Sequence, residues 1–161
     1  MAMRPVDVAL EAVRFLSITR GADEPTPAPT DTQVAEAHQL LGRPLPPSYL
    51  AFIAEAGTLM PPGWDLYWVG PPDMARRNLV VANQVERDHD DCPLPEHLIA
   101  FFDDDTGDQY CFDTSRPDEQ GEYPVVLWDR DRGCDEQLDE GLFVAADDFL
   151  DWVKRYIAEH F

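Results

Sequence analysis

The chain has 161 residues, of which 32 are acidic and 12 are basic, and its formal net charge is -20. This length suits one domain whose core needs no crosslinks, and the negative field repels nucleic acid and anionic lipid while it attracts cationic partners. Asp7, Glu11 and Arg14 interrupt the first apolar run, so we expect neither a signal peptide nor a membrane span there.

The cysteines indicate a reducing compartment. Cys92, Cys111 and Cys134 are an odd number at wide spacing, which fits free thiols better than a disulfide framework. We therefore expect a cytoplasmic protein without stabilising disulfides. His89 and Cys92 form an isolated H-x-x-C, and because the other half of a zinc site is missing, we predict no metal site and no cofactor.

The first part of the chain predicts one helix that precedes the core. Apolar residues at helical spacing predict a helix over residues 5–19, and alternating prolines predict an extended linker over residues 21–30. Residues 31–161 then form the core. We therefore expect residues 1–161 to make up a single domain.

Two further helices are predicted after the linker. Thr30 and Gln33 have the arrangement of a capping box, which predicts a helix that begins after Thr30 and ends at Gly42. The prolines that follow predict a rigid bend. Pro47 or Ser48 then starts the next helix, and Gly57 is its predicted end.

The segment between these helices and the centre of the chain predicts a strand and a helix. Residues 64–69 alternate as in a strand, and we expect core packing for two of its aromatic residues, with ligand stacking as the alternative. Asp73 is predicted to be the N-cap of a helix that continues through Asn78 to Val85.

The centre of the chain predicts three consecutive antiparallel strands. Residues 98–102 are a continuous apolar run, residues 109–113 alternate, and residues 125–128 are β-branched and aromatic. Turn residues separate these segments. In the second strand Tyr110 and Phe112 share one face, and the other face, which we expect to be wet, is formed by Gln109, Cys111 and Asp113.

The last part of the chain predicts a long loop, a short strand and a closing helix. Residues 129–141 are too polar for the core and predict the loop, whereas residues 142–145 predict the fourth strand. Asp147 is predicted to cap a helix whose wide apolar face docks on the sheet. The predicted fold class is therefore α+β, with a central antiparallel β-sheet in meander order and helices packed on one side.

Four blocks of the sequence carry a family resemblance. They are residues 40–57, 98–114, 123–131 and 144–153, and the most specific parts are Gly107-Asp108 with Tyr110 to Asp113, and Pro124 to Asp129. In this order the blocks resemble those of the SUKH superfamily, which groups bacterial immunity proteins against secreted toxins with fungal regulators of cell-wall synthesis. The resemblance covers residues 31–157. It implies an α+β fold and a noncatalytic role that is executed by binding a partner protein, and it implies no catalytic residues.

The acidic residues are concentrated in one quarter of the chain. Residues 101–140 hold fourteen acidic side chains against three arginines. We therefore expect a basic protein, namely a toxin domain, as the partner, although acidity that serves only solubility is the alternative. Electrostatics would set the encounter rate, and exposed aromatic rings would prolong the complex. The residues predicted to bind the partner are Asp103, Asp104, Asp105, Asp108, Asp113, Asp129, Trp64, Tyr67 and Trp128.

Two other functions stay open at the level of the sequence. The Asp103–Asp108 turn offers several oxygens to a hard cation, but an EF-hand that began at Asp103 would need ligands where Gly107 and Thr114 stand. An Asp-rich metal-dependent or carboxylate-based enzyme is the first alternative. A regulatory scaffold without a toxin partner is the second. Because no nucleophile or phosphate-binding motif is found, we predict that the protein is not an enzyme.

Overall fold

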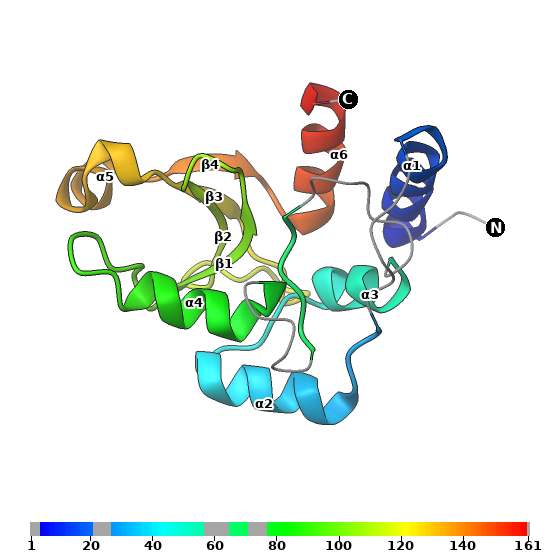
Figure 1. Cartoon of the computed structure of the whole chain (residues 1–161), viewed down its shortest axis with the longest axis horizontal. Helices are drawn as coiled ribbons and strands as arrows, with labels where there is room; N and C mark the ends of the chain where they lie inside the picture. The colour runs from blue at the N-terminus through cyan, green and yellow to red at the C-terminus, as the bar shows by residue number, and fades with distance from the viewer. Residues whose placement is uncertain (1–3, 21–26, 57–64, 71–76, 161) are drawn as a thin grey trace.

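Four antiparallel strands in the order β1-β2-β3-β4 form the centre of the fold (Figure 1). The strands are β1 (Leu98–Asp103), β2 (Gln109–Asp113), β3 (Val125–Trp128) and β4 (Phe143–Ala146). The computed structural model describes residues 4–20, 27–56, 65–70 and 77–160. Each strand pairs with the next along the chain, so the predicted α+β fold with an antiparallel meander is confirmed.

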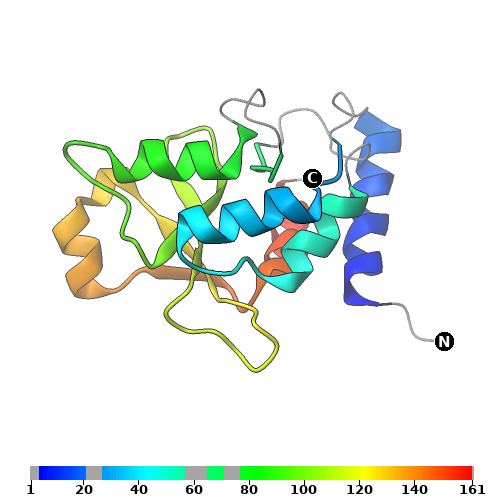
Figure 2. The ribbon, with the colours of Figure 1, turned by 90° about the horizontal axis from the view of Figure 1, so that it is seen from below.

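The helices surround this sheet and extend the molecule to one side of it. They are α1 (Pro5–Arg20), α2 (Asp31–Leu41), α3 (Pro47–Glu55), α4 (Leu79–Arg87), α5 (Cys134–Glu140) and α6 (Phe149–His160), with a short 3-10 helix η2 (Arg130–Arg132). Figure 2 shows α1 at one end of the molecule beside α3, and α5 at the opposite end. None of the helices in the described ranges has the length and apolar character of a membrane span.

The predicted capping box of α2 is present. The Gln33 amide donates to the Thr30 hydroxyl at 3.1 Å, and the Thr30 amide donates to the Gln33 side chain at 3.0 Å. Gly42 ends the helix with a φ of 74°, a left-handed conformation in which glycine has no Cβ penalty. Helix α3 begins at Pro47 as predicted. Its predicted end, Gly57, lies outside the described residues.

Two helices begin later than the sequence predicted. The Asn78 side chain accepts from the amides of Val80 and Val81, so Asn78 is the N-cap of α4 and not one of its interior residues. The predicted cap at Asp73 lies outside the described residues. At α6 the carboxylate of Asp148, one residue after the predicted cap, accepts from the Asp151 amide at 2.8 Å.

A bulge in β1 places two consecutive rings on the same face of the sheet. The register of β1 against β2 shifts at Phe101, so Phe101 and Phe102 both lie on the face of Tyr110. Trp152 of α6 contacts both rings, with centroid distances of 4.9 and 5.0 Å. Its ring also lies 5.4 Å from that of Tyr110. The predicted docking of the last helix on the sheet is therefore confirmed.

The other face of the sheet is buried, not wet. Gln109, Cys111 and Asp113 are exposed by only 1%, 0% and 6%. Glu86 and Arg87 of α4 interact electrostatically with the Cys111 thiol, which places α4 over this face. The expectation of helices on one side only is thus corrected. The alternation in β2 predicted a solvent-exposed face, but the polar residues on that face interact with other groups inside the protein.

The outer edge of β1 is occupied by the segment before α4. Leu66 forms an isolated antiparallel bridge with Phe102, where a strand was predicted over residues 64–69. Next to this bridge the Asn83 side chain of α4 bonds the backbone of Ala100. One edge of the sheet is therefore closed by groups of the same chain.

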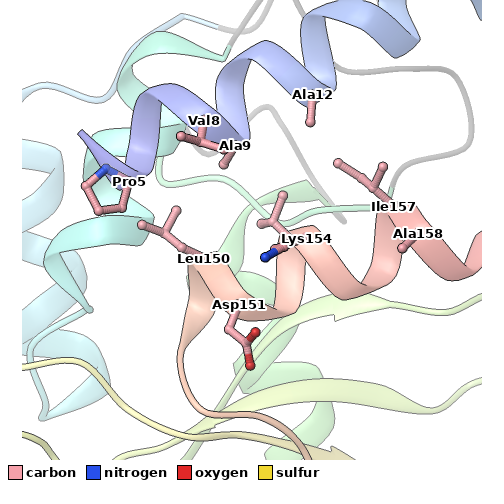
Figure 3. Close-up of a pocket in the computed structure, with 10 residues that line it drawn as sticks. Pro5, Val8, Ala9, Ala12, Leu150, Asp151, Lys154, Ile157 and Ala158 are labelled. Atoms are coloured by element: carbon pink, nitrogen blue, oxygen red, sulfur yellow. The ribbon is translucent and has the colours of Figure 1, made fainter. Parts of the chain in front are cut away.

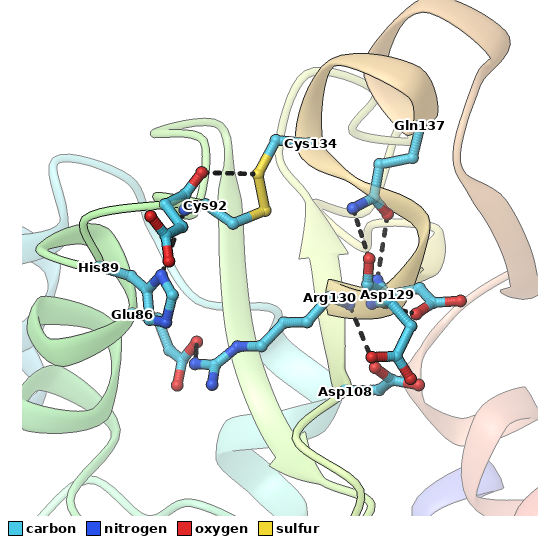
Figure 4. Close-up of a disulfide and its surroundings, with 10 residues drawn as sticks. Glu86, His89, Cys92, Asp108, Asp129, Arg130, Cys134 and Gln137 are labelled. Carbon is cyan, nitrogen blue, oxygen red and sulfur yellow. Dashed lines mark hydrogen bonds and ion pairs between the residues drawn. A yellow bond between two sulfur atoms is a disulfide. The ribbon is translucent and has the colours of Figure 1, made fainter.

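The segment predicted as a long loop over residues 129–141 is instead folded into η2 and α5. The buried side chain of Gln137 accepts from the Asp129 amide at 3.0 Å and donates to the Asp129 carbonyl at 2.7 Å (Figure 4). A polar side chain therefore anchors α5. Because this helix is not held by an apolar stripe, its sequence did not show the pattern that predicts a packed helix.

A disulfide joins Cys92 to Cys134, which corrects the expectation of free thiols. The two Cα atoms are 5.5 Å apart although the residues are 42 positions apart in the sequence. The bond ties the start of α5 to the connection between α4 and β1 (Figure 4). Only the tertiary fold brings the two residues together, so the cysteine count gives no support for a reducing compartment. Cys111 is a free, buried thiol.

Candidate functional site

The turn between β1 and β2 and the segment after β3 gather acidic residues at one end of the sheet. The Arg130 amide donates to the Asp108 carboxylate at 3.2 Å and so holds the two segments together (Figure 4). We call this surface the acidic end. It comprises Asp103, Asp104, Asp105, Asp108, Asp129, Asp131, Asp135, Glu136, Asp139 and Glu140.

The arginines of the acidic end are already engaged. Arg130 forms an ion pair with Glu86 of α4, and Arg132 pairs with Glu140 at 3.1 Å. Three of the four acidic residues of α5 lie outside these pairs and are exposed to solvent; they are Asp135, Glu136 and Asp139. The surface therefore keeps an excess of negative charge at neutral pH.

The carboxylates in the turn between β1 and β2 shape that turn. Asp103 accepts from the Asp105 amide at 2.9 Å, and Asp104 accepts from both the amide and the hydroxyl of Thr106. Gly107 has a φ of +94°, which explains why glycine stands there. Among the described residues, no group of three or more His, Cys, Asp or Glu side chains is arranged to hold a metal ion.

A polar hollow of about 330 Å³ opens beside this turn. It is lined by Asp65, Tyr67, Arg77, Asp103 and Asp105. Burial raises the pKa of Asp65 to about 6, with a hydrogen bond to Asp105 and the charge of Asp103 acting in the same direction. Arg77 opposes this rise but does not cancel it. The hollow thus carries a negative potential that favours a cationic group.

Two of the aromatic residues predicted to bind the partner are buried. Trp128 is 0% exposed and Tyr67 is 7% exposed, so neither presents its ring to a partner. The Tyr67 hydroxyl instead donates to the Gln109 side chain at 2.7 Å. Both rings fill the face of the sheet that was predicted to be wet. The third predicted ring, Trp64, lies outside the described residues.

Asp113 is also withdrawn from the surface. Burial opposes its ionisation, but hydrogen bonds from Ser115 and Arg116 outweigh burial and lower the pKa of Asp113. The Ser115 hydroxyl donates to it at 2.6 Å and the Arg116 guanidinium at 3.0 Å. Asp113 therefore organises the start of the connection between β2 and β3. Of the predicted partner-binding residues, those that remain exposed or half-buried are Asp103, Asp104, Asp105, Asp108 and Asp129.

A group of exposed apolar side chains, not predicted from the sequence, lies beside the acidic end. Leu138 on α5 is 46% exposed, and Phe143 and Val144 on β4 are 64% and 46% exposed. The apolar residues of this segment predicted a strand but gave no prediction of its exposure. A signal was present in the acidic residues on both sides of this segment, Asp139 and Glu140 before it and Asp147 and Asp148 after it, since charged residues are typical of edge strands.

An apolar groove of about 430 Å³ lies at the far end of the molecule, between α1 and α6 (Figure 3). Val8 and Ala9 of α1 face Leu150 and Ile157 of α6 across it. Asp151 and Lys154 are the charged residues at its margin. The groove lies apart from the acidic end, at the seam where the first helix meets the last.

A family model described as SMI1-KNR4 cell-wall, SUKH_5, matches residues 13–158. The matched range includes all four strands and the whole acidic end. A comparison with curated proteins gives no match. The predicted resemblance is confirmed by the family match.

Proposed function

Since the chain belongs to the SUKH superfamily, we propose that it is an immunity-type binding domain that neutralises a basic toxin domain by binding it. Membership of this family is consistent with an immunity or a regulatory protein. The net charge of -20 favours a cationic partner over nucleic acid or an anionic membrane.

The observation that carries the proposal is the excess of exposed carboxylates at the acidic end. Its arginines are paired within the protein, and α5 is held in place by Gln137 and by the disulfide at Cys134. A rigid surface of one charge raises the rate of encounter with a surface of the opposite charge. In this proposal the bound domain covers the partner's active site and needs no chemistry of its own.

The test uses the protein encoded by the neighbouring gene, because immunity genes lie beside the genes of their toxins. We expect the two proteins to form a complex and the chain to restore growth of cells that express the toxin. The association rate should fall by about tenfold or more between about 50 and about 500 mM NaCl, since salt screens surface charges. An association rate insensitive to salt would remove the electrostatic part of the proposal.

The two alternative functions give different outcomes. A regulatory scaffold would bind a partner without any protection of growth, so the growth assay distinguishes it. An Asp-rich enzyme would bind a cation tightly and stoichiometrically at the Asp103–Asp108 turn. Calorimetry with calcium, magnesium and zinc tests that outcome, and we expect weak, salt-sensitive binding only.

A further inference from the structure

The two edges of the sheet differ in how they are covered. On the β1 side, the Leu66 bridge and the Asn83 side chain use the outward backbone groups. On the β4 side, the described residues supply no strand partner beyond β3. Natural proteins protect such an edge with lysine, proline, a bulge that twists it away or a covering segment. Strand β4 reads Phe-Val-Ala-Ala and carries neither lysine nor proline. Its register against β3 shifts once, at Ala145, so the regular part of its outer edge is the stretch that begins at Phe143 and precedes this bulge.

The side chains at the β4 edge are apolar and accessible. Phe143 lies on the same face as Tyr110, because both pair with Leu127 of β3. Together with Tyr156 of α6 they line a hollow of about 250 Å³. An extended segment that paired with β4 would cover the exposed ring of Phe143 and close this hollow. Backbone pairing of this kind supplies affinity, and the hollow supplies a place for one side chain.

The charges around β4 indicate the chemistry of the segment. No lysine or arginine stands between Arg132 and Lys154. The acidic residues of this stretch lie on both sides of β4, and they are Asp135, Glu136, Asp139, Glu140, Asp147, Asp148 and Asp151. Arg155, which lines the hollow together with Glu159, is paired with Asp151 at 2.9 Å. Pairing with a second copy of the chain would bring two molecules of charge -20 together, which is unfavourable. A basic segment has the complementary charge.

We propose that the β4 edge is the docking site for a short, basic, extended segment of the partner, which adds to the sheet as a fifth strand. This proposal rests on the proposed function and locates its contact. The carboxylates of α5 lie three to eight residues before Phe143, within reach of lysine or arginine side chains that flank the added strand. The exposed ring of Phe143 is the apolar anchor.

The experiment titrates the protein with a synthetic hexapeptide that alternates lysine and valine, observed by amide NMR. We expect the largest shifts at residues 143–146 and a smaller effect at α5. A peptide of the same sequence with alternate backbone nitrogens methylated should bind at least about tenfold more weakly, since it lacks N–H donors for strand pairing. A hexapeptide that alternates glutamate and valine should not bind.

The matched variants are Phe143→Lys and Leu40→Lys. The two side chains are almost equally exposed, by 64% and 63%, so both substitutions should leave the fold intact. Phe143→Lys should weaken binding of the peptide at least about tenfold, because a lysine on an edge strand opposes the pairing of a further strand. Leu40→Lys on α2 should have little effect on peptide binding. Equal effects of the two variants, or equal binding of the methylated peptide, would overturn the proposal.

The same variants separate this proposal from the proposed function. If Phe143→Lys binds the neighbouring gene's protein as tightly as the wild type does, and with the same salt dependence, the β4 edge is excluded while the acidic surface retains its role. If dimers of the wild type are found by sedimentation and Phe143→Lys abolishes them, the occupant is a second copy and the proposal of a basic partner strand is wrong.

Discussion

The Asn83 side chain forms two hydrogen bonds with the backbone of Ala100. Its amide donates to the carbonyl at 2.9 Å, and the Ala100 amide donates to its carbonyl oxygen at 2.8 Å. A side chain of α4 thus takes the place of a neighbouring strand at the edge of β1. Because Asn83 is fully buried, it closes this edge without exposing a polar group.

Asn83→Ala is expected to destabilise the fold by about 2–4 kcal/mol. The substitution leaves the buried amide and carbonyl of Ala100 without partners, and each such group costs about 1–3 kcal/mol. Urea unfolding measures the loss. Gln84→Ala, an exposed change on the same helix, is the control and should shift the midpoint very little. Equal midpoints for the two variants would contradict the role assigned to Asn83.

Loss of the Cys92–Cys134 disulfide is expected to lower the free energy of unfolding by up to about 4 kcal/mol. The bond closes a long loop, since the two cysteines are 42 positions apart, and the entropy of that loop in the unfolded chain sets the magnitude. Thermal unfolding with and without dithiothreitol measures it. Cys134→Ser should be as unstable as the reduced wild type, and reductant should not change it further.

The stability contributed by Asp65 is expected to depend on pH. Its pKa is raised from the ordinary value of 3.8 to about 6 in the folded state, so its contribution is fully present below 3.8 and is lost as pH rises through 6. Asp65→Asn should therefore stabilise the protein at pH 7.5, by roughly 1 kcal/mol after solvent screening is allowed for, and should change little near pH 4. Denaturant unfolding at both pH values measures this. The control is Asp90→Asn, which changes the net charge by the same amount at an exposed position. An equal gain in the free energy of unfolding for this control would show that net charge, and not the surroundings of Asp65, causes the effect.

Charge removal on α5 is expected to slow association with the partner more than the same removal elsewhere. Glu136→Gln with Asp139→Asn and Glu11→Gln with Glu36→Gln each remove two negative charges from exposed helix positions. The α5 pair should lower the association rate roughly threefold at low salt, because its charges lie nearest the proposed contact. Stopped-flow measurements with the neighbouring gene's protein test this. A larger effect of the α1–α2 pair would place the contact at the other end of the molecule.

Patterns of neighbouring residues in the sequence predicted several helices and strands correctly. The capping box at Thr30 and Gln33 fixes the start of α2, and the apolar and alternating runs fix β1, β2 and β3, because these features depend on neighbours along the chain. Exposure is not local. Trp128 was predicted to contact a partner but is buried, and the exposure of Phe143 was not predicted.

The sequence by itself determined the family, the order of the strands and the strongly negative charge, since motifs, periodicity and composition are properties of the chain alone. Only the tertiary structure decided that Cys92 meets Cys134, that Gln137 anchors α5 and that Asn83 closes one sheet edge while β4 leaves the other without a strand in the described part of the chain. The physical reason is that each of these contacts joins groups distant in sequence. Their proximity follows from how the helices pack on the sheet, which no short stretch of residues encodes.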